Sequence, residues 1–225
     1  MNTGENANTF LSQRTERGDQ IIIEAHEAAR DAMKERCPHL KVGLTLSLHD
    51  LQLADDSSEA KENVEKAWNE EFVHYLPAIE KDDFLGVQNY TREIIGKNGV
   101  QKAEEDAELT DMNYENYPEA LEHVIRKVAQ KYKGELFVTE NGIATENDVR
   151  RIKFIRTALD GVKNCIEDGI PVIGYMHWSL LDNFEWQKGY SMKFGLIEVD
   201  RVTKQRFPKE SLNVLGSYSD LGRQR

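Results

Sequence analysis

The sequence predicts an α/β fold in which parallel strands alternate with helices. Four short apolar segments typical of strands alternate along the chain with amphipathic segments of ten or more residues. Strands that are separated by helices of this length form parallel βαβ units with right-handed crossovers. A chain of 225 residues, of which 39% are hydrophobic, is also long enough to bury such a core as one domain.

The first half of the chain predicts two helices and two strands after a polar leader. Residues 1–18 are expected to form a flexible leader, because they lack apolar periodicity. Apolar side chains at helical spacing then predict a first helix, which Pro38 stops. The Leu-rich segment 42–49 predicts a strand, 59–76 predicts an amphipathic helix, and 84–90 predicts a second strand.

The second half continues the same alternation of strands and helices. An acidic stretch without periodicity, 101–111, is expected to be a surface loop. Thr145 is expected to cap the helix that follows it, and 201–208 is expected to be a turn region. The remaining elements are expected as helix 118–132, strand 136–138, helix 145–169, strand 172–177 and helix 209–218.

Charge and composition exclude several classes of protein. The net charge of −11 repels phosphate backbones and anionic membrane surfaces, so nucleic-acid binding and membrane binding are not expected. No apolar run approaches the roughly 20 residues that a bilayer span requires. Cys37 and Cys165 lack the spacing of metal ligands or redox pairs and are expected to be packing residues in a cytoplasmic protein.

Two segments near predicted strand ends carry side chains that could take part in binding or catalysis. Glu140 ends an apolar strand, and Gly142 just after it suits a sharp turn with positive φ. Glu185 lies in an aromatic segment, 177–186, that starts at the end of the next strand. Reactive groups of parallel α/β barrels stand at the carboxyl ends of strands, so these side chains are expected to converge. Carboxylates that accept two hydroxyls, beside aromatic faces that pack on C–H bonds, indicate sugar chemistry.

These segments resemble a known enzyme family. Residues 137–142 resemble the nucleophile signature of family 1 glycoside hydrolases, the β-glucosidase family. Residues 178–186, Gly189-Tyr190 and Phe194-Gly195 resemble its C-terminal signature, and 83–91 resembles its sixth strand. The resemblance covers roughly 13–218 and implies a partial TIM (β/α)8 barrel. Residues 19–225 would form a half-barrel domain whose four parallel βα units correspond to strands 5 to 8 of that barrel.

The resemblance also implies roles for individual residues. Glu140 would be the nucleophile that forms a covalent glycosyl-enzyme, and Tyr90 would donate a hydrogen bond that orients it. Glu185 would accept hydrogen bonds from two sugar hydroxyls. The positions that would bind the β-glycoside substrate are Gln88 (most members have Asn here), Trp178 as the floor, Glu185, Trp186 and Phe194. No cofactor is expected, because the sequence has no phosphate-cradling glycine loop.

The same comparison implies that the first four strands, with the Asn-Glu-Pro segment that holds the general acid/base, are missing. Retaining hydrolysis needs a second carboxyl group about 5 to 5.5 Å from the nucleophile. Residues 69–71, Asn-Glu-Glu, echo that segment but are expected to be a solvated helix face. The chain would therefore hydrolyse β-glucosides or β-galactosides only if a complementary N-terminal half-barrel chain supplied the acid.

Two other interpretations stay open. The chain could be a non-catalytic half-barrel that self-associates as a homo-oligomer, or a weak sugar-binding module, because a half-barrel leaves two open sheet edges. It could also be a truncated gene product without a role of its own. His49 and His177 lie near predicted strand ends, but two histidines without a third ligand are expected to be structural, so no metal is expected.

Overall fold

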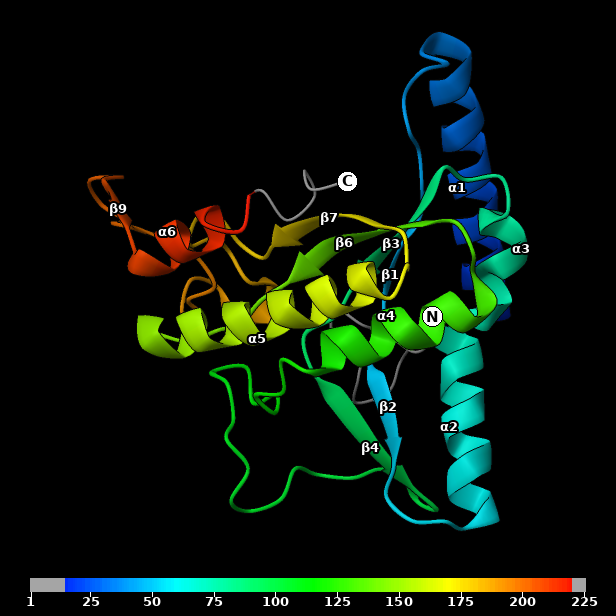
Figure 1. Cartoon of the computed structure of the whole chain (residues 1–225), viewed down its shortest axis with the longest axis horizontal. Coiled ribbons are helices and arrows are strands. Elements are labelled where there is room, and N and C mark those ends of the chain that lie inside the picture. The colour runs from blue at the N-terminus through cyan, green and yellow to red at the C-terminus, as the bar shows by residue number, and fades with distance from the viewer. Residues whose placement is uncertain (1–14, 220–225) are drawn as a thin grey trace.

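A four-stranded parallel sheet with helices packed on one face forms the centre of the molecule (Figure 1). The structure is a computed structural model and describes residues 15–219. The strand order is β1-β3-β6-β7, and each neighbouring pair is parallel. The predicted α/β class is therefore confirmed. The strands are β1 (Thr45–Ser47), β3 (Phe84–Gln88), β6 (Glu135–Asn141) and β7 (Val172–His177).

The helices follow the predicted order, although their ends differ by several residues. The helix α5 is capped by Asn147, whose side chain accepts from the backbone N–H groups of Val149 and Arg150, and not by Thr145 as predicted. Thr145 instead accepts a hydrogen bond from the backbone of Asn147. The helices are α1 (Glu16–Arg36), α2 (Ser58–Glu71), α3 (Leu76–Ile79), α4 (Ala120–Lys131), α5 (Asp148–Glu167) and α6 (Glu210–Gly216), with 3-10 turns η1 (Val73–Tyr75) and η2 (Trp186–Lys188).

Side chains alternate between the two faces of the sheet, as strand geometry requires. Leu85, Val87 and Val138 are buried in one core with apolar side chains of α2, α4 and α5. The opposite face carries side chains that remain partly or largely exposed, namely Thr45, Ser47, Phe84, Phe137, Thr139 and Met176. Within the described residues, β1 and β7 also have a sheet neighbour on one side only. One face and two edges of the sheet are thus left open.

The sequence did not predict two smaller sheets beyond the carboxyl ends of the main strands. β2 (Asp50–Leu53) pairs in parallel with β4 (Arg92–Gly96), which turns back onto β5 (Gly99–Val100). A hairpin joins β8 (Ile197–Val199) to β9 (Arg206–Pro208), so the end of the predicted turn region 201–208 is a strand. These strands are two to five residues long, which is too short for a clear period in the sequence.

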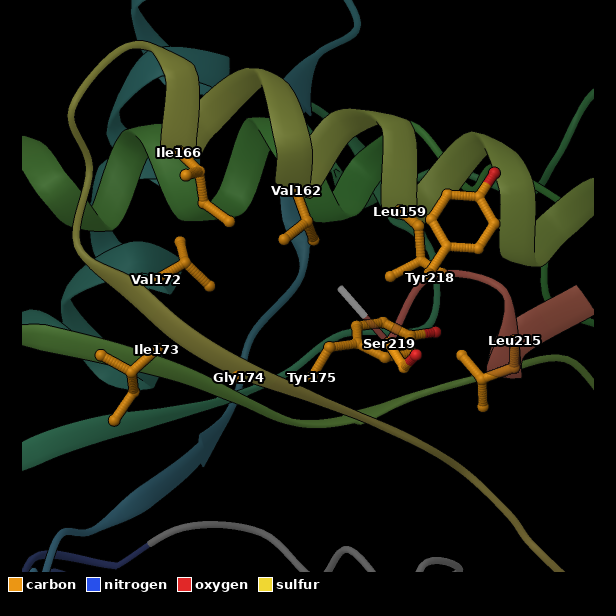
Figure 2. A pocket seen from close by; sticks show the side chains of 10 residues that line it. All are labelled: Leu159, Val162, Ile166, Val172, Ile173, Gly174, Tyr175, Leu215, Tyr218 and Ser219. Atoms are coloured by element: carbon orange, nitrogen blue, oxygen red, sulfur yellow. The ribbon is translucent and has the colours of Figure 1, made fainter. Parts of the chain in front are cut away.

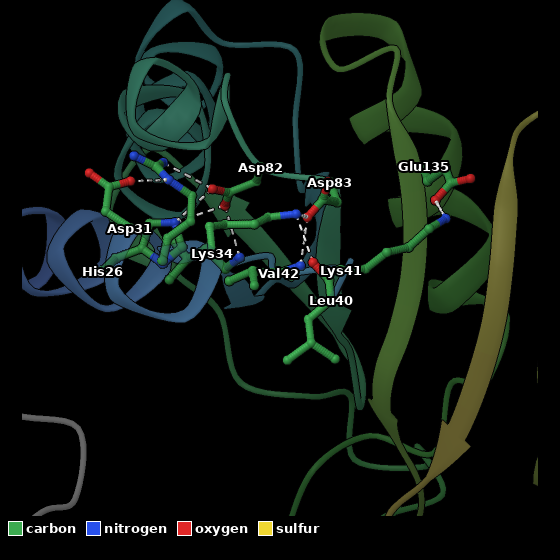
Figure 3. A network of polar contacts seen from close by, with 11 residues as sticks. His26, Asp31, Lys34, Leu40, Lys41, Val42, Asp82, Asp83 and Glu135 are labelled. Carbon is green, nitrogen blue, oxygen red and sulfur yellow. Dashed lines mark hydrogen bonds and ion pairs between the residues drawn. The ribbon is translucent and has the colours of Figure 1, made fainter. Parts of the chain in front are cut away.

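The N-terminal helix α1 extends away from the sheet and is tied to it by a polar network around Asp82 (Figure 3). The Asp82 carboxylate contacts the His26 ring at 2.8 Å and accepts from Arg30 at 3.1 Å and from the backbone of Leu44 at 3.0 Å. Because α1 begins at Glu16, the last residues of the predicted leader are helical, and the others lie outside the described range. Among residues 15–219, no helix has the length and apolarity needed to span a membrane.

Candidate active site

Glu140, the penultimate residue of β6, lies at the carboxyl end of the sheet with a donor on each carboxylate oxygen. The Gln88 side-chain amide donates to Glu140 Oε1 at 2.9 Å, and the Tyr90 hydroxyl donates to Oε2 at 2.6 Å. Gln88 ends β3, the strand next to β6, so the sheet itself sets this geometry. Both oxygens accept hydrogen bonds from neutral donors, which fixes the orientation of the carboxylate.

Buried amide side chains fix the strand ends around Glu140. The Asn89 amide donates to the backbone oxygen of Leu48 at 2.9 Å, and the Asn141 amide donates to that of Asn89 at 2.8 Å. The Tyr175 hydroxyl donates to Asn141 Oδ1 at 2.8 Å. These bonds link all four strands where the registers of β3, β6 and β7 shift. Sequence analysis missed these residues, although the two asparagines lie inside the family-like segments.

Burial and the nearby Glu140 carboxylate raise the pKa values of two neighbouring side chains, Tyr90 and Glu185. Burial, followed by the hydrogen bond to Glu140, raises the pKa of Tyr90, which keeps its hydroxyl protonated as a donor. Burial and the charge of Glu140 raise the pKa of Glu185, so the two carboxylates interact electrostatically. Burial and the charge of Glu185 raise the pKa of Tyr114. Tyr114 comes from the loop before α4 and was not predicted as part of this site.

The segment after β7 brings the aromatic residues to the same end of the sheet. The Phe194 ring packs edge-on against the Tyr90 ring, with 6.1 Å between centroids. Trp178 and Glu185 are half-buried, whereas Trp186 is 57% exposed. The structure thus links Glu140, Tyr90, Gln88, Glu185 and Phe194 through direct or electrostatic contacts. It places Trp178 directly after β7 and Trp186 at the start of η2.

Gly142 lies where the backbone after β6 meets the backbone after β7. A Cβ atom at this position would lie 1.9 Å from the carbonyl oxygen of Trp178. The positive φ predicted for Gly142 is not observed, because the positive-φ glycines of the described residues are Gly99, Gly169 and Gly189. Close approach of two chain segments, rather than a left-handed turn, therefore requires glycine here.

Arg151 holds the segment that carries Phe194 by a hydrogen bond to its backbone. Its side chain is fully buried and donates to the backbone oxygens of Thr145 and Lys193 and to Asp148 Oδ1. The bond to Lys193 measures 2.8 Å and adjoins Phe194 directly. The buried guanidinium at the start of α5 thus fixes the position of the backbone that carries Phe194.

The two histidines near strand ends have separate environments. Burial lowers the pKa of His177 to about 3, so this ring is neutral. The His49 ring contacts Glu71 Oε1 at 2.8 Å, and the His49 backbone N–H donates to Glu71 Oε2 at 3.0 Å. The prediction that residues 69–71 form only a solvated helix face is therefore wrong for Glu71.

An apolar cavity of about 330 Å³ lies beside the open edge strand β7 (Figure 2). Side chains of α5 and α6 face β7 across it, including Val162, Ile166 and Leu215. Ile173 on β7 borders the cavity and is 45% exposed. Gln88, Tyr90, Glu140, Glu185 and Phe194 do not line this cavity, and Tyr175 borders it from the network around Glu140.

The strand-end carboxylate of Glu140 thus has a phenol and an amide on its oxygens and aromatic rings nearby, at the end of a parallel α/β sheet where reactive groups stand in barrel enzymes. Comparison with known proteins identifies the family. The model of glycosyl hydrolase family 1 matches residues 71–220. Because this match covers most of the chain, the chain belongs to that family.

Several relatives of this chain are named β-galactosidases or β-glucosidases. The chain is 36% identical over 157 residues to a β-galactosidase of Pyrococcus woesei, which covers 60% of this chain and 31% of that protein. It is 32% identical over 226 residues to a β-galactosidase of Saccharolobus solfataricus, which covers 84% of this chain and 45% of that protein. The crystal structure of β-glycosidase BGL167 superposes with a TM-score of 0.87 at 42% identity, covering 94% of this chain and 50% of that chain. The chain thus spans about half of that structure and less than half of these relatives.

Proposed function

We propose that this chain is the C-terminal half of a retaining β-glycosidase, with its four main strands in barrel positions five to eight. It would hydrolyse β-glucosides or β-galactosides once a complementary half-barrel supplies the general acid/base. The observation that carries the proposal is the Glu140 carboxylate with one donor on each oxygen. The names of the relatives, β-glucosidase and β-galactosidase, support the substrate class.

In this mechanism, Glu140 attacks the anomeric carbon while a partner carboxylic acid protonates the leaving oxygen. The partner group would lie about 5 to 5.5 Å from Glu140 and would then activate the water that hydrolyses the glycosyl ester. Tyr90 and Gln88 hold the Glu140 carboxylate in the orientation required for attack. The direct bond gives Gln88 an orienting role in addition to the sugar contact inferred from the family resemblance.

The remaining side chains would bind the glycone. The half-buried Glu185 offers two oxygens to vicinal sugar hydroxyls, because a carboxylate accepts several hydrogen bonds at once. Trp178 would form the floor beneath the ring, Trp186 would add an indole contact to the same sugar, and Phe194, packed against Tyr90, would shape the wall of the subsite. The complementary half-barrel would pack on the open face of the sheet and complete the substrate-binding site.

The test is complementation. Co-expression with the N-terminal half of the Thermotoga maritima β-glucosidase A, a 35% identical relative, is expected to yield hydrolysis of an aryl β-glucoside. On a β-glucoside with a poor leaving group, the chain alone should be at least about 10²-fold slower than the complemented enzyme, because no acid assists departure of the leaving group. With a dinitrophenyl glucoside, which needs little acid assistance, the ratio between the rates of the complemented enzyme and the chain alone should be smaller. A stable one-to-one assembly without hydrolysis of either substrate would contradict the proposal.

Tyr90→Phe in the complemented enzyme is expected to reduce kcat by roughly 10- to 100-fold. It removes a 2.6 Å hydrogen bond to the nucleophile, and bonds to charged groups contribute about 1.5–3 kcal/mol. Steady-state kinetics with an aryl β-glucoside measure this change. Tyr132→Phe is the matched control, since that phenol lies at the end of α4, away from Glu140, and should leave kcat unchanged. Equal effects of the two substitutions would contradict the assigned role.

The second candidate function is a self-associating half-barrel that binds sugar without hydrolysing it. The open sheet edge favours it, because Ile173 of β7, beside the apolar cavity, is 45% exposed, and Met176 on the open face of the same strand is 54% exposed. Sedimentation of the purified chain separates the candidates. A folded homo-oligomer that gains no activity with the complementary half supports the second, and a monomer that combines with that half supports the first.

A further inference from the structure

Three side chains with metal-binding atoms gather where the main sheet continues into the smaller one. His49 lies between β1 and β2, Glu71 ends α2, and Glu93 belongs to β4. One nitrogen or oxygen atom from each residue lies within 4.8 Å of the others. Within residues 15–219, this is the group of three histidine, cysteine or acidic residues that meets this spacing. The proposed glycosidase mechanism uses none of the three.

Glu71 fixes the His49 ring in one orientation. Its two oxygens contact His49 Nδ1 at 2.8 Å and the His49 backbone nitrogen at 3.0 Å. With Nδ1 as the donor to this carboxylate, the neutral ring has its lone pair on Nε2. Metal-binding histidines commonly donate their second nitrogen to a carboxylate in this way. Glu71 therefore prepares Nε2 as a ligand atom.

The free nitrogen faces a second carboxylate across a gap. His49 Nε2 and Glu93 Oε1 are 4.0 Å apart, which is too long for a hydrogen bond. Zinc lies about 2.0–2.1 Å from imidazole nitrogen and about 2.0–2.2 Å from carboxylate oxygen. With tetrahedral geometry these bond lengths put the two ligand atoms about 3.4 Å apart, so an ion fits once the side chains approach each other by about 0.6 Å. The side chains of His49, Glu71 and Glu93 are 29%, 22% and 32% exposed, so ions in solution can reach them.

The neighbouring cations are engaged elsewhere. Arg92, beside Glu93 on β4, pairs with Glu115 at 2.6 Å, and His123 on α4 contacts Asp50 at 2.7 Å. Lys127 on α4 lies 4.3 Å above the Trp68 ring. Burial lowers the pKa of Lys127, whereas the charges of Asp50 and Glu71 act in the opposite direction. The cluster thus combines two carboxylates with one imidazole, and this negative balance favours a divalent cation.

We propose that His49 and Glu93 bind a divalent transition-metal ion of the zinc type, with Glu71 holding the imidazole from behind and water completing the coordination. Imidazole with carboxylate is a donor set that suits zinc, and the open positions suit a solvent-accessible site. The bound ion would join the segment after β1 to β4. His49 would then be a metal ligand, whereas the sequence alone predicts a structural histidine and no metal.

Isothermal titration of the purified chain with ZnCl₂ at slightly alkaline pH tests the proposal. The wild type is expected to bind one ion, and His49→Ala and Glu93→Gln should each weaken binding at least about 10-fold. Glu71→Gln should weaken it roughly 10- to 100-fold, since it removes the charge behind the ring. His39→Ala, which removes an exposed histidine from a loop, is the matched control and should bind as the wild type does.

Glu93→Gln keeps the His49–Glu71 bond, so it decides the outcome if the histidine variant fails to fold. Zinc should also raise the Tm of the wild type in a concentration-dependent way, and Glu93→Gln should need at least about 10-fold more zinc for the same rise. Absence of saturable binding at millimolar zinc would overturn the proposal. Unchanged affinity in both Glu93→Gln and Glu71→Gln would overturn it as well. Neither result depends on glycosidase activity, so the proposed function is tested separately.

Discussion

Glu140→Gln is expected to reduce glycosidase activity of the complemented enzyme on the order of 10⁴-fold or more. The substitution keeps the size and shape of the side chain but removes the charged oxygen that would form the glycosyl ester. It also places an amide group opposite two donors, the Gln88 amide and the Tyr90 hydroxyl, which both need an acceptor. Both effects act on the chemical step, so kcat should fall far more than KM rises.

Steady-state kinetics with a dinitrophenyl glucoside measure this loss. Glu135→Gln is the matched control because Glu135 lies at the opposite end of the same strand, where it pairs with Lys41 at the surface. It should retain the activity of the complemented enzyme, since surface ion pairs contribute little. Substantial hydrolysis by Glu140→Gln, with correct assembly, would show that the nucleophile has been assigned to the wrong residue.

Arg151→Met is expected to lower the free energy of unfolding by about 3–5 kcal/mol. The guanidinium is fully buried and bonds to Asp148 and to the backbone oxygens of Thr145 and Lys193. Methionine roughly fills the space but leaves these acceptors without a donor, and breaking a buried pair costs about this much. Because the Lys193 bond adjoins Phe194, the sugar-binding wall should loosen as well.

Urea unfolding followed by circular dichroism measures the change. Arg156→Met provides the control, since Arg156 lies on the same helix with its side chain exposed to solvent. Its unfolding free energy should stay within about 0.5 kcal/mol of the wild type. Equal midpoints for the two variants would mean that the buried guanidinium contributes no more than a surface charge.

The order of the main elements could be predicted because their signals are local. Each main strand coincides with an apolar run, and α4 and α5 show apolar positions at helical spacing. Glu140 and Tyr90 could be predicted to converge because both follow parallel strands, whose carboxyl ends meet at one edge of a sheet. The structure confirms that they converge, with 2.6 Å between the Tyr90 hydroxyl and Glu140 Oε2.

Features that depend on distant pairing could not be predicted. β2 pairs with β4 only because β1 and β3 bring the two segments side by side. Residues that meet there, such as Gln52 and Arg92, are 40 positions apart in the sequence. Asn147 and Thr145 are both good helix caps, and the path of the chain selects Asn147. Gln88 was expected on the sugar, and only the register between β3 and β6 shows its amide on Glu140.

The sequence by itself determined the α/β class, the alternation of the main strands and helices, and the side-chain types of a sugar site, because periodicity and short motifs are local properties. The tertiary structure decided which oxygen of Glu140 each donor contacts, why Gly142 lacks a side chain, and that His49, Glu71 and Glu93 meet. The physical reason is that such contacts join segments far apart in the chain. Their distances are set by strand register and packing, which no local pattern encodes.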